Sequence, residues 1–208
     1  MFFNVLLLVL SLHLCAGQTI LFGACENVET MKYFELERFL GKWYEIERIP
    51  SWYDDDAMCS YKIIQRCGRR IEFQHGFVKD SIQYILHVNS TYTPGAEAVF
   101  DIQKNNIDPF GIPLSIITTD YTNYAIMYGC KVNPELNLKY VLAWVLSRNK
   151  TLSSKLLDEA HQRLMTIPST SLAYFHPVSH SEKLCDHMWS AHVHAHHHEA
   201  DNDSLAET

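Results

Sequence analysis

The sequence predicts an all-β protein with one helix, folded as either a barrel or a sandwich. Eight segments are rich in aromatic and β-branched residues and follow one another at roughly 8–12-residue spacing. They cover residues 43–49, 60–65, 71–78, 82–93, 96–103, 114–119, 124–130 and 138–147. Turn-forming residues such as Pro94-Gly95 and Asn133-Pro134 separate them. After the eighth segment, apolar residues from Leu152 to Met165 recur with the helical period, which predicts the single helix.

Length and composition suit one globular domain with a short appendage at each end. The chain has 208 residues, of which 47% are hydrophobic and 20% charged. Its net charge of −7 comes mostly from the segment after Cys185, which holds five acidic residues and no lysine or arginine. The body is therefore nearly neutral, and nucleic acid is not an expected partner. We expect a domain at residues 18–185 and a tail at residues 186–208.

Residues 1–17 have the features of a secretory signal peptide. They carry no charged side chain, contain an apolar run that begins at Val5, and end in Cys15-Ala16-Gly17. The run is short for a membrane-spanning helix, which takes about 20 residues, so we do not expect a spanning protein. The alternative is a buried helix or an uncleaved anchor. Secretion to the extracellular space would also permit N-glycosylation at the sequons of Asn89, Asn149 and Asn202.

The tail after Cys185 is dominated by histidine. His192, His194, His196, His197 and His198 lie within seven residues. Neutral imidazoles at this density bind Zn²⁺ or Cu²⁺ and can ligate haem iron, so these five are candidate metal ligands. The alternative is a polar tail whose metal affinity is incidental. We expect residues 186–208 to be disordered when free, because the segment shows no apolar periodicity.

Alternation along the strands suggests which side chains face the interior. Side chains two residues apart share a face, which groups Trp144 with Leu142 and Leu146. The same rule gives interior candidates on three other strands: Phe73 with His75, Phe100, and Tyr128. An eight-stranded barrel is wide enough for one small ligand, and aromatic walls with a few polar groups are typical of ligand sites. The alternative is an ordinary packed core.

No catalytic motif is present in the sequence. It lacks the Gly-X-Ser-X-Gly, His-Glu-X-X-His and P-loop patterns. Glu45 and Glu47 are expected on the face of Trp43, where an ion pair at the barrel end is a simpler interpretation than acid–base catalysis. We therefore expect a protein that is not an enzyme.

Three motifs in order resemble the lipocalin family. They are Gly41-Lys42-Trp43, Thr119-Asp120-Tyr121, and Arg148 directly after the eighth segment. The similarity is greatest to the apolipoprotein D and arthropod bilin-binding branch, over residues 25–185. The resemblance implies an eight-stranded up-and-down antiparallel barrel with a C-terminal helix packed on it. It also implies that Arg148 stacks on Trp43 to close one end, a structural role.

The resemblance also implies a disulfide pattern that the sequence alone leaves open. It pairs Cys25 with Cys130 and Cys59 with Cys185. Cys67 remains, either as a free thiol or as a bridge in a dimer.

The function implied is that of a secreted carrier. The resemblance suggests a protein that transports or sequesters a small hydrophobic ligand such as a fatty acid, sterol, retinoid or bilin pigment, with Trp144, Tyr61 and His75 near it. No cofactor is required, although a bound bilin or haem would fit the interpretation. The alternative is a metal- or haem-sequestering protein that works through the C-terminal histidines.

Overall fold

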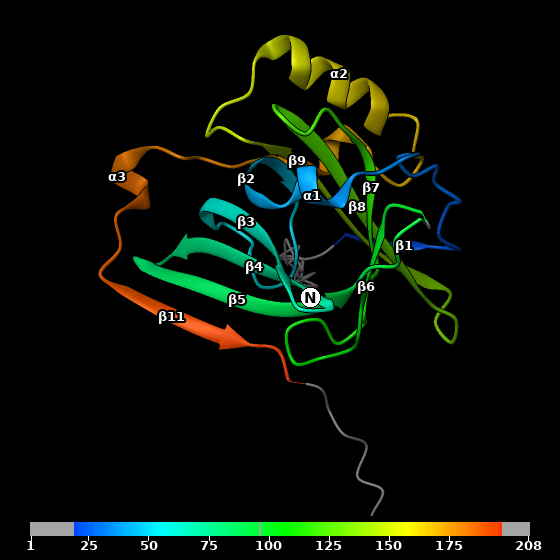
Figure 1. Ribbon diagram of the computed structural model, residues 1–208, viewed down its shortest axis with the longest axis horizontal. Coiled ribbons are helices and arrows are strands. Elements are labelled where there is room, and N and C mark those ends of the chain that lie inside the picture. Colours follow the sequence, from blue (N-terminus) through cyan, green and yellow to red (C-terminus); the bar gives the residue numbers. More distant parts are fainter. Residues whose placement is uncertain (1–18, 96, 197–208) are drawn as a thin grey trace, which may run out of the picture.

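The computed structural model describes residues 19–95 and 97–196, and eight antiparallel strands form a closed barrel (Figure 1). The strands are β2 (Gly41–Ile49), β3 (Met58–Cys67), β4 (Arg70–Lys79), β5 (Ile82–Thr91), β6 (Val99–Ile102), β7 (Leu114–Thr119), β8 (Tyr124–Asn133) and β9 (Leu138–Ser147). Each pairs with the next, and β9 pairs with β2 to close the barrel. The expectation of a barrel is confirmed, and a sandwich is excluded.

The remaining elements pack around this barrel. They are β1 (Thr19–Phe22), α1 (Leu36–Phe39), α2 (Ser154–Leu164), a 3₁₀ turn η1 (Leu172–Tyr174), β10 (His176–Pro177), α3 (Glu182–Cys185) and β11 (Trp189–His194). The Ser153 side chain caps α2, which is the predicted helix, and α2 covers the outer face of β8 and β9 (Figure 1). Within the described residues, no helix is both long and apolar enough to cross a membrane.

One end of the barrel is closed by Trp43. The Arg148 guanidinium lies 3.7 Å from the centre of the indole, and Trp43 Nε1 donates a hydrogen bond to the Phe39 carbonyl at 2.8 Å. Arg148 also donates to the carbonyl oxygens of Lys42 and Tyr121. The side-chain donors of Trp43 and Arg148 therefore have backbone acceptors, and these motif residues are structural, as the resemblance implied. We call this the closed end.

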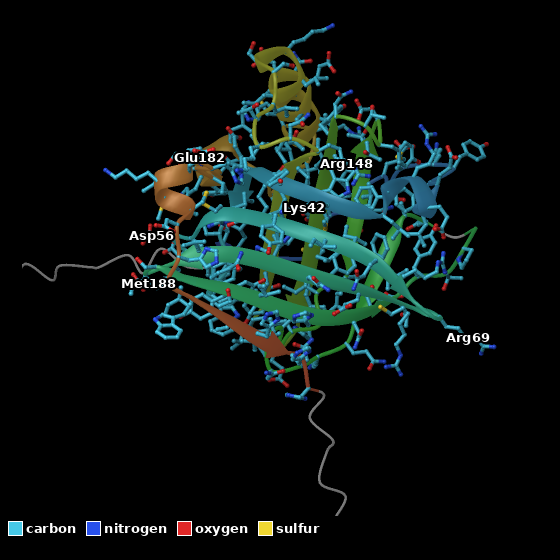
Figure 2. All side chains as sticks on the ribbon, turned by 60° about the vertical axis from the view of Figure 1, so that its left-hand side comes forward. Lys42, Asp56, Arg69, Arg148, Glu182 and Met188 are labelled. Carbon is cyan, nitrogen blue, oxygen red and sulfur yellow. A yellow bond between two sulfur atoms is a disulfide. The ribbon has the colours of Figure 1, made fainter. Side chains whose placement is uncertain are left out.

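The opposite end is the mouth. Figure 2 shows Asp56, from the β2–β3 loop, and Met188, just before β11, at one end of the barrel, and Arg69, from the β3–β4 turn, at the other. The mouth is formed by the loops at residues 50–57 and 103–113.

Both disulfides implied by the resemblance are present. Cys25–Cys130 ties the N-terminal segment to β8, and Cys59–Cys185 ties α3 to β3. Cys67 is free and exposed at the end of β3, so a dimer through this thiol stays a prediction. Asn89 and Asn149 are exposed.

The C-terminal segment differs from the disordered tail that we expected. Residues Trp189–His194 form β11, which pairs in parallel with Ile82–His87 of β5 (Figure 1). The reason lies in the barrel wall, because β6 pairs with β5 only at Ser90 and Thr91 and leaves the rest of that edge open. His197, His198, Asn202 and residues 1–18 lie outside the described residues.

Candidate ligand-binding site

A cavity opens between the barrel walls on the mouth side of the aromatic core, and we call it the inner cavity. Lys62, Phe73, His75, Leu142 and Trp144 line its walls, and residues 51–53 and 107–112 line its opening. Its volume is about 80 Å³. Ligand pockets usually measure about 300–1,000 Å³, so a lipid or pigment requires side chains to move.

A larger groove lies beside the inner cavity at the mouth, and we call it the outer groove. It measures about 380 Å³ and is lined by Phe77, Tyr84 and, from β11, Val193. Four residues line both spaces and therefore stand between them: Trp52, Tyr53, Leu86 and Ile107. Movement of these side chains would join the two spaces into one elongated site.

Three of the six predicted pocket residues line the inner cavity. They are Phe73, His75 and Trp144, which alternation along β4 and β9 directs inward. Phe100 also faces the interior but lies deeper, with its ring 5.1 Å from Phe73 and 6.4 Å from Phe39. It belongs to the packed floor below the cavity. Whether these residues bind a ligand stays a prediction.

Tyr61 does not face the interior, so this expectation is wrong. Its ring lies under the Lys42 ammonium, 4.0 Å away, and against Gly76, where a Cβ atom would come within 2.2 Å of the ring. A bulge in the β3–β4 pairing between Met58 and Tyr61 sets this register, and Lys62 takes the inward position.

Tyr128 is also on the outer face of its strand, contrary to expectation. Its hydroxyl lies 3.0 Å from Ser169 Oγ and 3.3 Å from Glu26, in the cluster under α2. Ala125 and Met127 are the inward residues of β8. Because α2 covers the outer face, both faces of β8 are apolar and alternation could not separate them.

A cluster of buried charges borders the inner cavity, and we call it the charged cluster. Glu45 Oε1 lies 2.7 Å from Lys62 Nζ and 3.0 Å from His75 Nε2, and Glu45 Oε2 accepts a hydrogen bond from Arg48 at 3.1 Å. Arg48 Nε lies 3.5 Å from an Asp54 carboxylate oxygen. Two acidic and two basic side chains are thus taken out of water together, which requires close pairing.

The charges of this cluster balance without any added ion. Burial raises the pKa of Glu45, but Lys62, His75 and Arg48 outweigh burial and hold that pKa well below its ordinary value. Burial and the nearby Lys62 charge lower the pKa of His75, which is therefore neutral at pH 7. Glu45, Asp54 and His75 lie close enough for a metal site. Arg48 and Lys62 already supply the two positive charges that a divalent cation would bring.

Glu45 and Glu47 do not share a face, so the expected carboxylate pair is wrong. A bulge between them shifts the β2–β9 register and turns Glu47 outward. There His161 Nε2, on α2, lies 2.7 Å from Glu47 Oε2. The same bulge directs Arg48 into the barrel, where it is 3% exposed and meets Asp54 and Ser60. The two carboxylates therefore do not act together on one side of β2.

Sequence reasoning placed Glu45 in an ion pair but missed its partners Lys62 and Arg48, and also Asp54. Lys62 follows from the inward position of Ile64 once the β3 register is known, but Arg48 and Asp54 depend on a bulge and a loop. Tyr53 lies in the same loop, and its hydroxyl is 3.5 Å from His75 Nδ1.

Comparison with known proteins assigns the family. The model of the lipocalin / cytosolic fatty-acid binding protein family matches residues 40–178. That span runs from the start of β2 to just beyond β10 and includes the whole barrel. The chain therefore belongs to this family.

Among characterised proteins, the relatives include insecticyanin-A, apolipoprotein D and a bilin-binding protein. The chain is 25% identical to insecticyanin-A of Manduca sexta over 154 residues, covering 69% of this chain and 79% of that protein. It is 29% identical to apolipoprotein D of Cavia porcellus, covering 65% and 72%. It is 24% identical to the bilin-binding protein of Pieris brassicae, covering 78% and 87%.

Solved structures show the same fold. Insecticyanin from Manduca sexta superposes with a TM-score of 0.74 at 22% identity, covering 85% of this chain and 97% of that chain. Apocrustacyanin C1 superposes with a TM-score of 0.66 at 19% identity, covering 78% and 92%.

Proposed function

We propose that this protein is a secreted carrier that binds an elongated, mostly apolar ligand, such as a bilin pigment, retinoid, sterol or other lipid, in the inner cavity and outer groove. The observation that carries the proposal is an aromatic cavity inside a closed barrel, bordered by charges that are already paired. We expect it to bind its ligand without turnover, because the charged groups that border the cavity are paired with one another, as Glu45 is with Lys62 and His75. The names of the relatives, which include a bilin-binding protein and apolipoprotein D, support this class of ligand.

The charged cluster favours a ligand whose buried end is neutral. Lys62 is paired with Glu45 at 2.7 Å and so offers no spare charge to a carboxylate. Trp144 is 2% exposed, and its indole nitrogen has no hydrogen-bond partner among the described residues. An unmade hydrogen bond at a buried donor costs about 1–3 kcal/mol, which a carbonyl oxygen on the ligand would recover. A lactam or ketone carbonyl on an apolar skeleton fits this requirement.

Substitution of Trp144 tests the proposal directly. In titrations with biliverdin and with all-trans-retinol, Trp144→Ala is expected to weaken the better probe at least 10-fold, because it removes aromatic contact area and the indole donor. Trp144→Phe keeps most of the area and is expected to lose about 5-fold, the equivalent of one hydrogen bond at roughly 1 kcal/mol. Ligand-induced quenching of tryptophan fluorescence measures both affinities.

Trp189→Phe is the matched control. This tryptophan is 71% exposed on β11, so its replacement should leave both affinities unchanged. Each variant is first shown to be folded by circular dichroism. If folded Trp144→Ala binds as tightly as the unmodified protein, the ligand is not in the inner cavity. Native mass spectrometry of protein from its natural source would identify the bound molecule.

A further inference from the structure

The histidines of β11 stand on the outer surface of the barrel beside another histidine. Val193 packs inward near Phe77 and Leu86, so its neighbours His192 and His194 project outward. His194 lies opposite His87 in the parallel pairing of β11 with β5. Figure 1 shows β11 running alongside β5 at the rim of the barrel. Three imidazoles from two strands therefore meet at one place.

Two of these three rings lie at the separation expected for ligands of one ion. His87 Nε2 lies 3.0 Å from His192 Nδ1, and the His87 and His194 rings stack with their centres 4.3 Å apart. Two nitrogens that bind one ion at 2.0–2.1 Å lie about 2.9–3.4 Å apart in square-planar or tetrahedral geometry. The His87–His192 separation already falls in this range. The exposed His194 ring can turn about its side-chain bonds to supply a third nitrogen.

The carboxylate of Glu72, on β4, orients the His87 ring for metal binding. The Nδ1–H of His87 donates to Glu72 Oε1 at 2.7 Å, which leaves the lone pair of Nε2 pointing toward His192. The other oxygen of this carboxylate accepts a hydrogen bond from Gln65 Nε2 at 2.6 Å, which fixes the position of Glu72. A carboxylate behind a ligating histidine fixes the tautomer and raises the basicity of the ring.

We propose that His87, His192 and His194 bind one divalent transition-metal ion, Zn²⁺ or Cu²⁺, with Glu72 as the positioning residue behind His87. Binding moves the proton of His192 from Nδ1 to Nε2, and water completes the coordination. The ion joins β11 to β5 and so holds the C-terminal strand over the open edge of the barrel wall. This site is independent of the ligand proposed for the inner cavity, and it differs from a free chelating tail because one ligand belongs to the barrel.

Replacement of His87 separates the two kinds of site. Calorimetric titration of the full-length protein with Zn²⁺ should show one site with a Kd in the micromolar range or tighter. His87→Gln leaves all tail histidines in place and should weaken that site at least 10-fold. His176→Gln changes an exposed histidine on β10 and should have no effect. Equal binding by His87→Gln and the unmodified protein would overturn the proposal, as would the absence of binding at 100 µM.

Two further variants and one exchange measurement distinguish loss of the metal site from loss of folding. His194→Gln lies at an exposed position and should also weaken Zn²⁺ binding at least 10-fold, and Glu72→Gln should weaken it about 10- to 100-fold. Saturating Zn²⁺ should slow amide hydrogen exchange in residues 189–194 of the unmodified protein at least 10-fold, and should not do so in His87→Gln. Unchanged exchange of these amides in the unmodified protein would show that the ion does not hold β11 and would overturn the proposal.

Discussion

The closed end of the barrel and the half beside the inner cavity use opposite kinds of side chain, although the same strands build both. At the closed end, Trp43, Phe39 and Phe100 are fully buried, and the donors at this end bond to backbone carbonyls. Beside the cavity, β2 and β3 instead bury Glu45 and Lys62. One step of two residues along β2, from Trp43 to Glu45, separates the two environments.

This difference indicates that the two ends of the barrel contribute differently to stability and to ligand binding. Burial of aromatic surface is a large favourable contribution to folding, whereas a buried ion pair gains little net stability after desolvation. The closed end therefore holds the barrel together, and the charged cluster shapes the cavity at little net gain in stability. Changes at the two ends should then have separable effects on stability and on binding.

The largest expected effect is at the closed end. Trp43→Ala should lower the free energy of unfolding by about 4 kcal/mol, because it removes a fully buried indole and the surface on which Arg148 stacks. Urea denaturation measures the change. The fraction that remains folded should still bind the probe ligand with unchanged affinity, in contrast to Trp144→Ala. A matching loss of affinity in folded Trp43→Ala would show that the two ends are coupled.

Breaking one partner in the charged cluster is expected to have the next largest effect. Glu45→Gln should cost about 3 kcal/mol of unfolding free energy, since it leaves Lys62 and Arg48 buried with only Asp54 to balance them. The double variant Glu45→Gln with Lys62→Met removes one charge of each sign and should recover at least half of that loss. Denaturation of the three proteins in parallel gives the coupling energy. A double variant no more stable than Glu45→Gln alone would mean that Lys62 is not desolvated.

The closed end could be predicted from the sequence because its signal is local. Gly41, Trp43 and Arg148 fall in motifs of fixed residues, and the strands around them alternate regularly. The interior placement of Phe73, His75 and Trp144 followed from the same alternation. These positions depend only on the two-residue period of a strand.

The placement of Glu47, Arg48 and Lys62 could not be predicted, because it depends on irregularities of the chain. One bulge turns Glu47 out and Arg48 in, and another places Tyr61 outside and Lys62 inside. A one-residue shift reverses every following side chain, and nothing in the composition of these strands marks the shift.

The C-terminal strand β11 could not be predicted from the sequence either. Ala191, Val193 and Ala195 alternate with histidines, which is a strand pattern, yet small residues give it little weight. What makes this segment a strand is the open edge of β5, which exists only after the barrel forms.

The smallest effect expected is a pH dependence that belongs to the charged half alone. Burial and the Lys62 charge hold the folded pKa of His75 below its ordinary value of 6.5, and burial does the same for His180. Around His75 lie Glu45, Asp54, Lys62 and the Tyr53 hydroxyl. Below pH 6.5 the unfolded chain takes up protons that the folded chain does not.

Stability should therefore be complete above pH 6.5 and fall as the pH drops below it, by at most about 1.4 kcal/mol per pH unit for each histidine. A second decline should begin below pH 4.5, because the folded pKa of Glu45 is also depressed. The unfolded chain then takes up a proton that the folded chain does not, which lowers stability. Urea denaturation at a series of pH values measures both. His75→Gln should flatten the first decline and leave the second, whereas His176→Gln, which changes an exposed histidine on β10, should change neither. A His75→Gln profile that still falls as steeply between pH 6.5 and 5 would assign the proton uptake to other groups and would place His75 in contact with water.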